Sequence, residues 1–356
     1  MANPKFTVDP TKATEELLRM STKLTAGLQN LMTIEDMEIA PTPKELVYEE
    51  DLVQVYHYTP TVPKPHSVPV LIVYALVNKQ YMMDLQANKS VIKKMLDAGL
   101  DLYIIDWGYP SGVNKFITLD DYINGYIDNV VDYIRQAHGL ESINILGVCQ
   151  GATFSACYTA MHQEKVRNFI SFVMPFDFSV DDGLLFRWSR KMPIADVVKA
   201  NHNILSGDSM NDTYNMLKPL ELTIDKYLAF IDKLDDRDAV VDFLRMEQWI
   251  YDSPDQAGPT LQQFIEDFYQ GNKFKEGTLT LGGRECNPKQ ITCPTLVMLA
   301  QKDHLVPPSS TRPFMDAISS KDKTLREFPV GHIGMFVSSR VLNDVGPSIA
   351  EWVKER

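Results

Sequence analysis

One cysteine of this chain lies in a context that suits a nucleophile. Residues 143–152 read INILGVCQGA, so Cys149 follows an apolar run and has Gly147 and Gly151 at a spacing of two on either side. A nucleophile held at a sharp turn between a strand and a helix needs such neighbours, because larger side chains would collide with the adjacent elements. The start of the helix also places positive potential near the sulfur, which favours the thiolate. The pattern predicts a nucleophile elbow at Cys149.

A base and an acid for this thiol can be placed further along the chain. A nucleophile of this kind needs a base to take its proton and an acid to orient the base. In a sheet that carries such an elbow, the acid and then the histidine follow late strands. Asp303 follows the apolar run TLVMLA, and His332 follows TLREFPV. We expect Cys149, Asp303 and His332 to form a catalytic triad.

Donors for a developing oxyanion can be proposed next to the same turn. The backbone N–H of Gln150, the residue after the nucleophile, is the first. The second should follow the apolar run PVLIVYAL at 69–76. We favour the N–H of Val77, with Asn78 as the alternative through its side chain or backbone. An ordinary strand-to-helix turn without this role also remains open for Val77 and Asn78.

The remaining cysteines and one histidine carry less context. Cys157 should be a packed small hydrophobe in the helix after the elbow, and neither Cys286 nor Cys293 has an adjacent glycine elbow. His304 adjoins Asp303, but adjacent side chains in a loop seldom converge, so we expect a structural or supporting role. In a chain of this size without a signal-peptide pattern, no disulfide framework is expected. No Cys-x-x-Cys pair is present and no histidine lies at zinc-finger spacing from a cysteine pair, so no structural zinc site is expected either.

These residues lie in an alternation of apolar runs and helical patterns that is typical of a mostly parallel sheet. We therefore expect an α/β-hydrolase fold. Thr118 and Asp121 resemble a capping box at the start of one helix, and Pro347 should bend or restart the last helix. Strands are expected within 69–76, 102–108, 143–148, 168–175, 295–308 and 324–334, and helices at 89–98, 118–138, 150–162 and 341–355.

Three segments are expected. Residues 41–175 and 291–356 should form the α/β-hydrolase core, and residues 176–290 a large, mainly helical cap, because that stretch shows no clear buried strand and is too long for a loop. Residues 1–40 should contain an amphipathic helix with apolar residues at 17, 20, 24, 28 and 31. We favour a stripe that covers the protein's own core, with docking of a partner helix as the alternative.

Composition limits the partners. The formal net charge of −12 argues against nucleic acid or an anionic membrane surface as the main partner. No stretch is long and apolar enough to cross a bilayer, and residues 1–20 lack the plan of a signal peptide. We expect a cytoplasmic protein.

A cysteine in place of serine indicates the kind of acyl chemistry. Exchange between a thioester and a thiol conserves the energy of the acyl bond, which can then be transferred to a hydroxyl as a stable oxoester. Cys149 therefore favours acyl transfer from a thioester such as an acyl-CoA, and a cap that excludes water would suppress hydrolysis. The alternative is a cysteine-dependent α/β-hydrolase that acts on lactones or thioesters.

Several motifs together resemble the polyhydroxyalkanoate synthases, in particular the catalytic subunit of the two-subunit class III type. They are LIVYALVNKQYMMDLQ, IIDWGYP, LDDYINGYID, ILGVCQGA, QKDHLVPP and GHIG, and the resemblance covers about residues 10–354. The chain departs from the common pattern at Ala152, where a second glycine is frequent, and at Lys302. Neither residue should touch the chemistry.

The resemblance implies that (R)-3-hydroxyacyl-CoA, chiefly 3-hydroxybutyryl-CoA, acylates Cys149 and extends a polyester with release of CoA. His332 would deprotonate the thiol, and Asp303 would activate the incoming 3-hydroxyl as well as orient the histidine. The CoA thioester is the substrate, and no cofactor is expected. A second, non-homologous synthase subunit, a homodimer, a cap that opens and a cytoplasmic location at polymer granules are also implied. A granule-bound scaffold without activity is a further alternative, which the intact triad disfavours.

Overall fold

The centre of the protein is one eight-stranded sheet. The computed structural model describes residues 10–34 and 37–356, so parts of the expected N-terminal segment, at 1–9 and 35–36, lie outside the described residues. The first two strands are antiparallel, and the other six run parallel to one another. In order across the sheet the strands are β1 (Lys44–Glu50), β2 (Val53–Tyr58), β6 (Leu102–Asp106), β3 (Val70–Val73), β7 (Ile143–Val148), β8 (Val166–Phe172), β13 (Thr295–Ala300) and β14 (Lys323–Phe328).

This arrangement confirms the α/β-hydrolase fold that the apolar runs predicted. Strands β3, β7 and β13 are buried along their whole length, which explains why their sequences are continuous and apolar rather than alternating. The β1–β2 hairpin was not predicted. Most β1 side chains are exposed or half-buried at the edge of the sheet, so the strand is rich in glutamate and lacks a clear apolar pattern.

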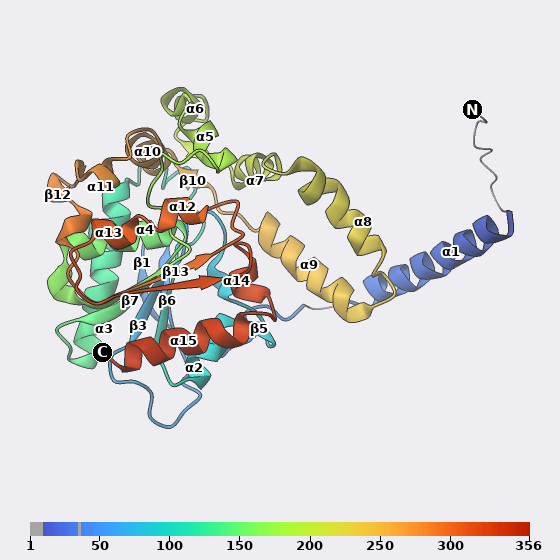
Figure 1. The fold of residues 1–356 in the computed structure, drawn as a ribbon, viewed down its shortest axis with the longest axis horizontal. Coiled ribbons are helices and arrows are strands. Elements are labelled where there is room, and N and C mark those ends of the chain that lie inside the picture. Colours follow the sequence, from blue (N-terminus) through green and yellow to red (C-terminus); the bar gives the residue numbers. More distant parts are fainter. Residues whose placement is uncertain (1–9, 35–36) are drawn as a thin grey trace, which may run out of the picture.

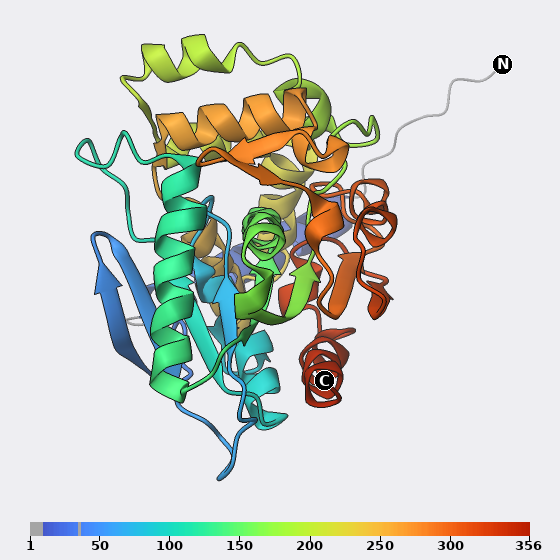
Figure 2. The ribbon, with the colours of Figure 1, turned by 90° about the vertical axis from the view of Figure 1, so that its left-hand side faces the viewer.

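Helices cover both faces of the sheet, and each face has its own apolar cluster (Figure 1 and Figure 2). Helices α3 and α4 pack on one face, and α2 and α15 on the other. The core helices and short strands are η1 (Gln80–Met83), β4 (Asp84–Gln86), β5 (Lys89–Ser90), α2 (Val91–Asp97), η2 (Asp121–Ile127), α3 (Asp128–His138), α4 (Gln150–Met161), η3 (Gln163–Lys165), α12 (Pro308–Thr311), α13 (Phe314–Ala317), α14 (Gly334–Val337) and α15 (Leu342–Lys354).

The sequence made two predictions about helix ends, the capping box at Thr118 and the effect of Pro347. The Thr118 hydroxyl accepts the N–H of Asp121 at 3.2 Å, and the Asp121 carboxylate accepts the N–H of Thr118 at 2.8 Å, so the capping box is confirmed. The helix that follows begins as the π-helical turn η2 and ends at Gly139, whose φ is +63°. Pro347 lies inside α15, which runs on without restarting, so a restart at Pro347 is wrong.

Residues 176–290 add no strand to the central sheet and lie over the carboxyl ends of its strands (Figure 2). The segment is mainly helical, but it also holds two two-stranded sheets that its sequence pattern did not predict. Its elements are α5 (Leu184–Ser189), α6 (Ile194–Ala200), β9 (Ile204–Leu205), α7 (Gly207–Asn215), η4 (Leu220–Asp225), α8 (Lys226–Ile231), α9 (Arg237–Tyr251), β10 (Gln256–Ala257), α10 (Gly258–Gln263), η5 (Phe264–Gln270), α11 (Lys273–Glu276), β11 (Leu279–Leu281), β12 (Arg284–Cys286) and η6 (Pro288–Gln290).

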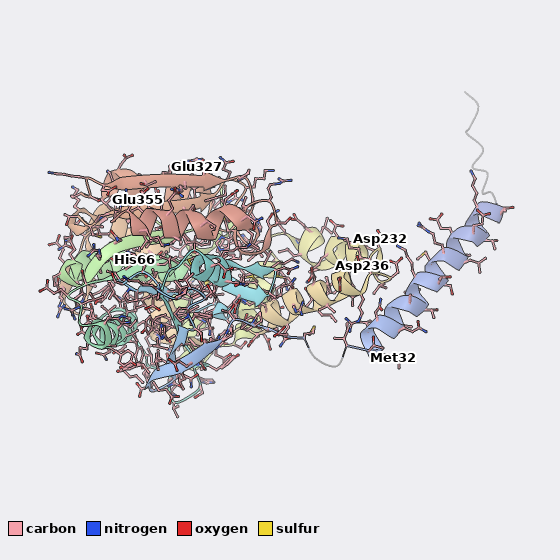
Figure 3. The ribbon with its side chains drawn as sticks, turned by 90° about the horizontal axis from the view of Figure 1, so that it is seen from below. Met32, His66, Asp232, Asp236, Glu327 and Glu355 are labelled. Atoms are coloured by element: carbon pink, nitrogen blue, oxygen red, sulfur yellow. The ribbon has the colours of Figure 1, made fainter. Side chains whose placement is uncertain are left out.

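Helix α1 (Pro10–Met32) projects from the body of the protein (Figure 1). Its C-terminal half contacts the turn between α8 and α9 near Asp232 and Asp236 (Figure 3). Leu17 is 68% exposed, and the rest of the apolar stripe is exposed too. The expectation that this stripe covers the core is therefore wrong. Within the described residues, no helix has the length and apolarity needed to cross a membrane.

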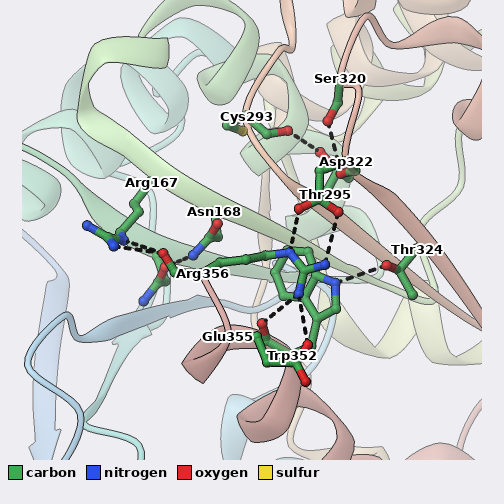
Figure 4. A network of polar contacts seen from close by, with 11 residues as sticks. Arg167, Asn168, Cys293, Thr295, Ser320, Asp322, Thr324, Trp352, Glu355 and Arg356 are labelled. Atoms are coloured by element: carbon green, nitrogen blue, oxygen red, sulfur yellow. Dashed lines mark hydrogen bonds and ion pairs between the residues drawn. The ribbon is translucent and has the colours of Figure 1, made fainter.

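The C-terminus ties the last helix to the sheet (Figure 4). The Arg356 guanidinium donates to the Asp322 carboxylate at 2.7 Å and 3.0 Å, and Trp352 Nε1 donates to the Thr324 hydroxyl at 3.0 Å. Arg167 of β8 donates to the Arg356 carbonyl at 2.7 Å. These contacts fix α15 beside β14, the strand that precedes the His332 loop.

Candidate active site

Cys149 lies at the turn between β7 and α4 and precedes the first residue of the helix. Its φ and ψ are 52° and −121°, a conformation that residues other than glycine rarely adopt. Strain of this kind typically costs about 1–3 kcal/mol and is concentrated at functional sites. The Cys149 N–H donates to the Phe172 carbonyl of β8 at 2.9 Å, which holds the turn in place.

The two flanking glycines are required by close backbone contacts. A Cβ at Gly147 would lie 2.4 Å from the Ala152 Cα. A Cβ at Gly151 would lie 2.3 Å from the Val73 carbonyl oxygen and 2.4 Å from that of Tyr74. These distances are shorter than any real carbon contact, so neither position accepts a side chain without a backbone shift. The structure thus shows the crowding that the glycine spacing predicted.

Asp303 and His332 meet at the ends of neighbouring strands. Asp303 follows β13, and His332 follows β14, its parallel neighbour. His332 Nδ1–H donates to Asp303 Oδ2 at 2.6 Å, and both side chains are buried. The other carboxylate oxygen of Asp303 accepts the N–H groups of Leu305 and Val306, each at 2.9 Å. Asp303 is therefore fixed by its own loop and in turn orients the imidazole.

Cys149 and His332 line the same cavity, and His332 lies within electrostatic reach of the Cys149 sulfur, so the structure brings the three predicted residues together. Burial lowers the pKa of His332, but the Asp303 carboxylate and Cys149 outweigh it, and the pKa lies well above its usual value. Because Nδ1–H is committed to Asp303, Nε2 is the nitrogen left to exchange a proton with the Cys149 sulfur. This is the geometry that a general base for a thiol needs.

The candidate oxyanion donors lie at the same turn. The Gln150 N–H is at the first position of α4, where helical N–H groups have no partner in the helix. Val77 and Asn78 both line the cavity next to Cys149. The Asn78 carboxamide, however, donates to the Ser253 hydroxyl at 2.6 Å. Its side chain is thus directed at the segment 176–290, which leaves the backbone N–H groups of Val77 and Asn78 as the candidates.

A cavity of about 240 Å³ lies over Cys149. One wall comes from the ends of the strands, and the other from α5, α7, α9 and η5. Of the described residues that line it, none is an aspartate, glutamate, lysine or arginine, and the only titratable nitrogens belong to His304 and His332. Such a wall suits an uncharged acyl or ester group.

Several polar residues in or behind the wall of this cavity escaped the sequence analysis. Gln256 Nε2 donates to the Leu76 carbonyl at 2.8 Å, and the Leu76 N–H donates to Gln150 Oε1 at 3.1 Å. Tyr214 and Tyr269 lie within electrostatic reach of Cys149. Burial is the main cause that raises the pKa of both; the Cys149 sulfur adds to it for Tyr214, and Tyr214 followed by Cys149 adds to it for Tyr269. No local motif marks these residues, because their role depends on how segment 176–290 folds back onto the core.

The other candidate groups stay apart from the thiol. Cys157 and Cys286 are fully buried, and burial raises the pKa of Cys157. Burial also raises the pKa of Cys293, to about 11. His304 lines the cavity, whereas His332 is the ring that bonds to Asp303. Across residues 10–34 and 37–356, no cluster of three or more His, Cys, Asp or Glu side chains is arranged to hold a metal ion.

Comparison with known families agrees with this architecture. The family described as the alpha/beta hydrolase fold matches residues 68–339. The family described as the N-terminus of poly-beta-hydroxybutyrate polymerase (PhaC) matches residues 11–95. Among solved structures, a monoacylglycerol lipase from Paleococcus ferrophilus aligns with a TM-score of 0.55 at 16% identity, over 82% of this chain and 96% of that one. That similarity concerns the fold alone.

Curated relatives match almost the entire chain. The poly(3-hydroxyalkanoate) polymerase subunit PhaC of Allochromatium vinosum is 48% identical over 99% of this chain and 100% of its own length. The protein of the same name from Synechocystis is 45% identical, over 96% of this chain and 92% of its own length. With an elbow cysteine, a buried Asp–His pair and this degree of identity, the chain belongs to the poly(3-hydroxyalkanoate) polymerase subunit PhaC family.

Proposed function

We propose that this protein polymerises (R)-3-hydroxyacyl-CoA, chiefly 3-hydroxybutyryl-CoA, into polyhydroxyalkanoate with release of CoA. One observation carries the proposal: His332 is hydrogen-bonded to the buried Asp303 and lies within electrostatic reach of Cys149, at a cavity lined by no aspartate, glutamate, lysine or arginine among the described residues. The relatives named as polymerase subunits support the same activity. The reaction uses the CoA thioester as substrate and needs no cofactor.

In the first step, Cys149 Sγ attacks the thioester carbonyl of the substrate. His332 Nε2 holds the proton of the thiol, and Asp303 keeps the imidazolium in place. The oxyanion of the tetrahedral intermediate accepts the N–H groups of Gln150 and Val77. The bond between the carbonyl carbon and the CoA sulfur then breaks, the proton moves from His332 to the departing thiolate, and an acyl-Cys149 thioester remains.

In the second step, the 3-hydroxyl of another 3-hydroxyacyl-CoA attacks the acyl-Cys149 carbonyl. His332, assisted by Asp303, takes the hydroxyl proton and returns it to the cysteine sulfur. A carbon–oxygen ester bond forms, and the carbon–sulfur bond to Cys149 breaks. The lengthened chain, now a CoA thioester, acylates Cys149 again and releases CoA, so each round adds one monomer and frees one CoA.

Residues 176–290 serve as the cap in this proposal, on a core made of 41–175 and 291–356. The cap supplies the aromatic and aliphatic side of the cavity, including Trp249, Phe264 and Tyr269. A low-polarity wall disfavours bulk water, and therefore favours a hydroxyl acceptor over hydrolysis. Opening of the cap would admit the substrate and release the chain.

The partner proposals follow from membership in the two-subunit class III type. A second, non-homologous synthase subunit would complete the active assembly, and two copies of this chain would form a homodimer. Exposed apolar residues on α1 and α8, such as Leu28 and Leu228, are available for such contacts. The assembly would work in the cytoplasm at the surface of the polymer granule.

The test is CoA release from (R)-3-hydroxybutyryl-CoA with mass spectrometry of the protein, for the wild type and Cys149→Ala. Polymerisation predicts CoA release and a hydroxybutyryl or oligomeric adduct on the Cys149 peptide, both lost in Cys149→Ala. Cys293→Ala is the matched control, because Cys293 is the other half-exposed cysteine and its pKa of about 11 keeps it a thiol. That variant should keep both signals.

Other products would support other activities. CoA release that yields only free 3-hydroxybutyrate would identify the cysteine-dependent hydrolase. An absence of turnover even with the second subunit present would favour the inactive scaffold.

A further inference from the structure

Helix α7 presents a polar edge to an otherwise mostly apolar cavity wall. Asn211, Tyr214 and Asn215 line the cavity from this nine-residue helix. Residues three and four positions apart share one face of a helix, so all three side chains face the space over Cys149. Tyr214 is within electrostatic reach of the Cys149 sulfur, which places this edge beside the reacting group.

Asn211 is the most buried of the three, with 5% of its surface exposed. Its carboxamide oxygen lies 3.0 Å from the Ser253 hydroxyl. The same hydroxyl accepts from the Asn78 carboxamide at 2.6 Å and lies 3.1 Å from the Ile250 carbonyl. The chain Asn78–Ser253–Asn211 therefore connects the turn after β3 to helix α7.

Counting the hydrogen atoms available to the three hydrogen-bonded side chains Asn78, Ser253 and Asn211 shows that one atom of Asn211 has no partner. Ser253 carries a single hydroxyl hydrogen, which goes either to Asn211 Oδ1 or to the Ile250 carbonyl. With Oδ1 towards Ser253, Asn211 Nδ2 has no acceptor among the described residues. If the carboxamide is turned over, its nitrogen donates to Ser253 and its oxygen becomes the free atom. The free atom is itself buried, in a residue that lines the cavity, so a polar group of a ligand that enters this wall would supply the missing partner.

We propose that Asn211 binds the 3-hydroxyl of the 3-hydroxyacyl-CoA whose carbonyl approaches Cys149. A hydroxyl both donates and accepts, so it satisfies the free atom in either orientation of the carboxamide, whereas a carbonyl satisfies only one. This inference rests on the proposed polymerase function. It makes Asn211 a residue that distinguishes 3-hydroxyacyl groups from plain acyl groups, because the latter would leave the buried amide unpaired.

The test compares acylation of Cys149 by (R)-3-hydroxybutyryl-CoA and by butyryl-CoA, which lacks only the hydroxyl. The rate of adduct formation in a single turnover is followed by mass spectrometry of the full chain. Asn211→Ala should lower kcat/KM for the hydroxylated thioester about tenfold and change that for butyryl-CoA less than about twofold. Asn211→Ser, which keeps a small polar group, should fall between the wild type and Asn211→Ala.

Thr213→Ala is the matched control, since Thr213 is on the same helix and, among the described residues, its hydroxyl bonds to the Ser209 carbonyl of that helix alone. It should leave the ratio of the two rates unchanged. An unchanged ratio in Asn211→Ala and Asn211→Ser, or an equal fall for both thioesters, would overturn the assignment while leaving the polymerase proposal intact. A wild-type protein that forms no adduct on Cys149 with either thioester would overturn both.

Discussion

Gln256 and Leu76 are 180 positions apart in the chain, yet the side-chain amide of Gln256 donates to the Leu76 carbonyl at 2.8 Å. Gln256 is 4% exposed and belongs to β10 of segment 176–290, whereas Leu76 lies in the turn after β3. The N–H of the same Leu76 donates to Gln150 Oε1 at 3.1 Å. Two glutamines thus hold the N–H and the carbonyl of one residue, and that carbonyl shares its peptide unit with the N–H of Val77, the candidate oxyanion donor.

The first prediction concerns this contact. Gln256→Leu keeps a similar volume but leaves the Leu76 carbonyl without its donor, so the turn before Val77 should loosen. Removal of an oxyanion donor typically costs about 10²–10³ in kcat, and a displaced donor should cost less, about tenfold. The fall should appear in kcat rather than in KM, measured by CoA release. Gln262→Leu is the control, because Gln262 donates only to the nearby Glu266. A fall in both variants would show that the loss is not specific to the turn.

The second prediction concerns the elbow glycines. Gly151→Ala would place a Cβ 2.3 Å from the Val73 carbonyl oxygen, which requires a backbone shift between α4 and β3. We expect a loss of about 3 kcal/mol in the free energy of unfolding, measured by urea denaturation. Gly125→Ala is the control, since a Cβ at Gly125 meets nothing within 4 Å. That change should be neutral or stabilising by about 0.5–1 kcal/mol, because alanine favours a helix more than glycine does. Equal stability of both variants would contradict the crowding argument.

The third prediction uses the ionisation of His332. Its pKa in the folded protein is raised, because Asp303 and Cys149 outweigh the effect of burial. The protonated ring therefore stabilises the fold fully below the unfolded value of about 6.5, and this contribution is lost as the pH rises through the folded-state pKa. The difference in free energy of unfolding between the wild type and His332→Gln, measured by urea denaturation, should thus be largest near pH 6. It should shrink as the solution becomes alkaline, on the order of a few pH units above pH 6.

His202→Asn is the control for that experiment, because the His202 side chain is exposed and asparagine tolerates its positive φ of 56°. The pH dependence of this variant should follow that of the wild type. A stability difference for His332→Gln that grows with pH would show that the ring is neutral in the folded state, contrary to the prediction.

The parallel strands of the sheet could be predicted from the sequence, since strands buried on both faces carry continuous apolar runs. The edge strand β1 was not predicted, because it is half-exposed and its glutamates leave no apolar pattern. The prediction also failed at α1, because an amphipathic pattern indicates an apolar face but not what covers it. The proline rule predicted that Pro347 bends or restarts the last helix, and the restart does not occur, because Pro347 lies inside the continuous helix α15.

The proximity of Cys149, Asp303 and His332 followed from topology, since the carboxyl ends of parallel strands share one edge of the sheet. Their catalytic role stays a prediction. Gln256 and Asn211 could not be found in this way, because they reach the site only through the fold of residues 176–290. No periodicity or motif in that segment specifies which of its side chains turns inward.

The fourth prediction concerns α1. Leu17, Leu24 and Leu28 are exposed, and a helix with this much unburied apolar surface is suited to contact another chain. Replacement of all three by glutamate should weaken association with the second synthase subunit, observed by sedimentation velocity, and leave CoA release by the chain alone unchanged. Val113→Glu, at an exposed loop residue, is the control. Sedimentation identical to the wild type would show that α1 does not carry the contact.

The fifth prediction separates Cys149 from the other cysteines by alkylation. Cys149 opens onto the cavity, and His332, which lines the same cavity, offers a route for its proton. Cys157 and Cys286 are fully buried, and Cys293, with a pKa of about 11, is a thiol near neutral pH. Because the thiolate is the reactive form, iodoacetamide at pH 7 should modify the Cys149 peptide first, and mass spectrometry should show that activity falls in step with that modification. His332→Gln should slow alkylation of Cys149 without changing that of Cys293. If Cys293 reacts as fast as Cys149 in the wild type, the thiol at the elbow is not activated, and the nucleophile must be sought elsewhere in the cavity.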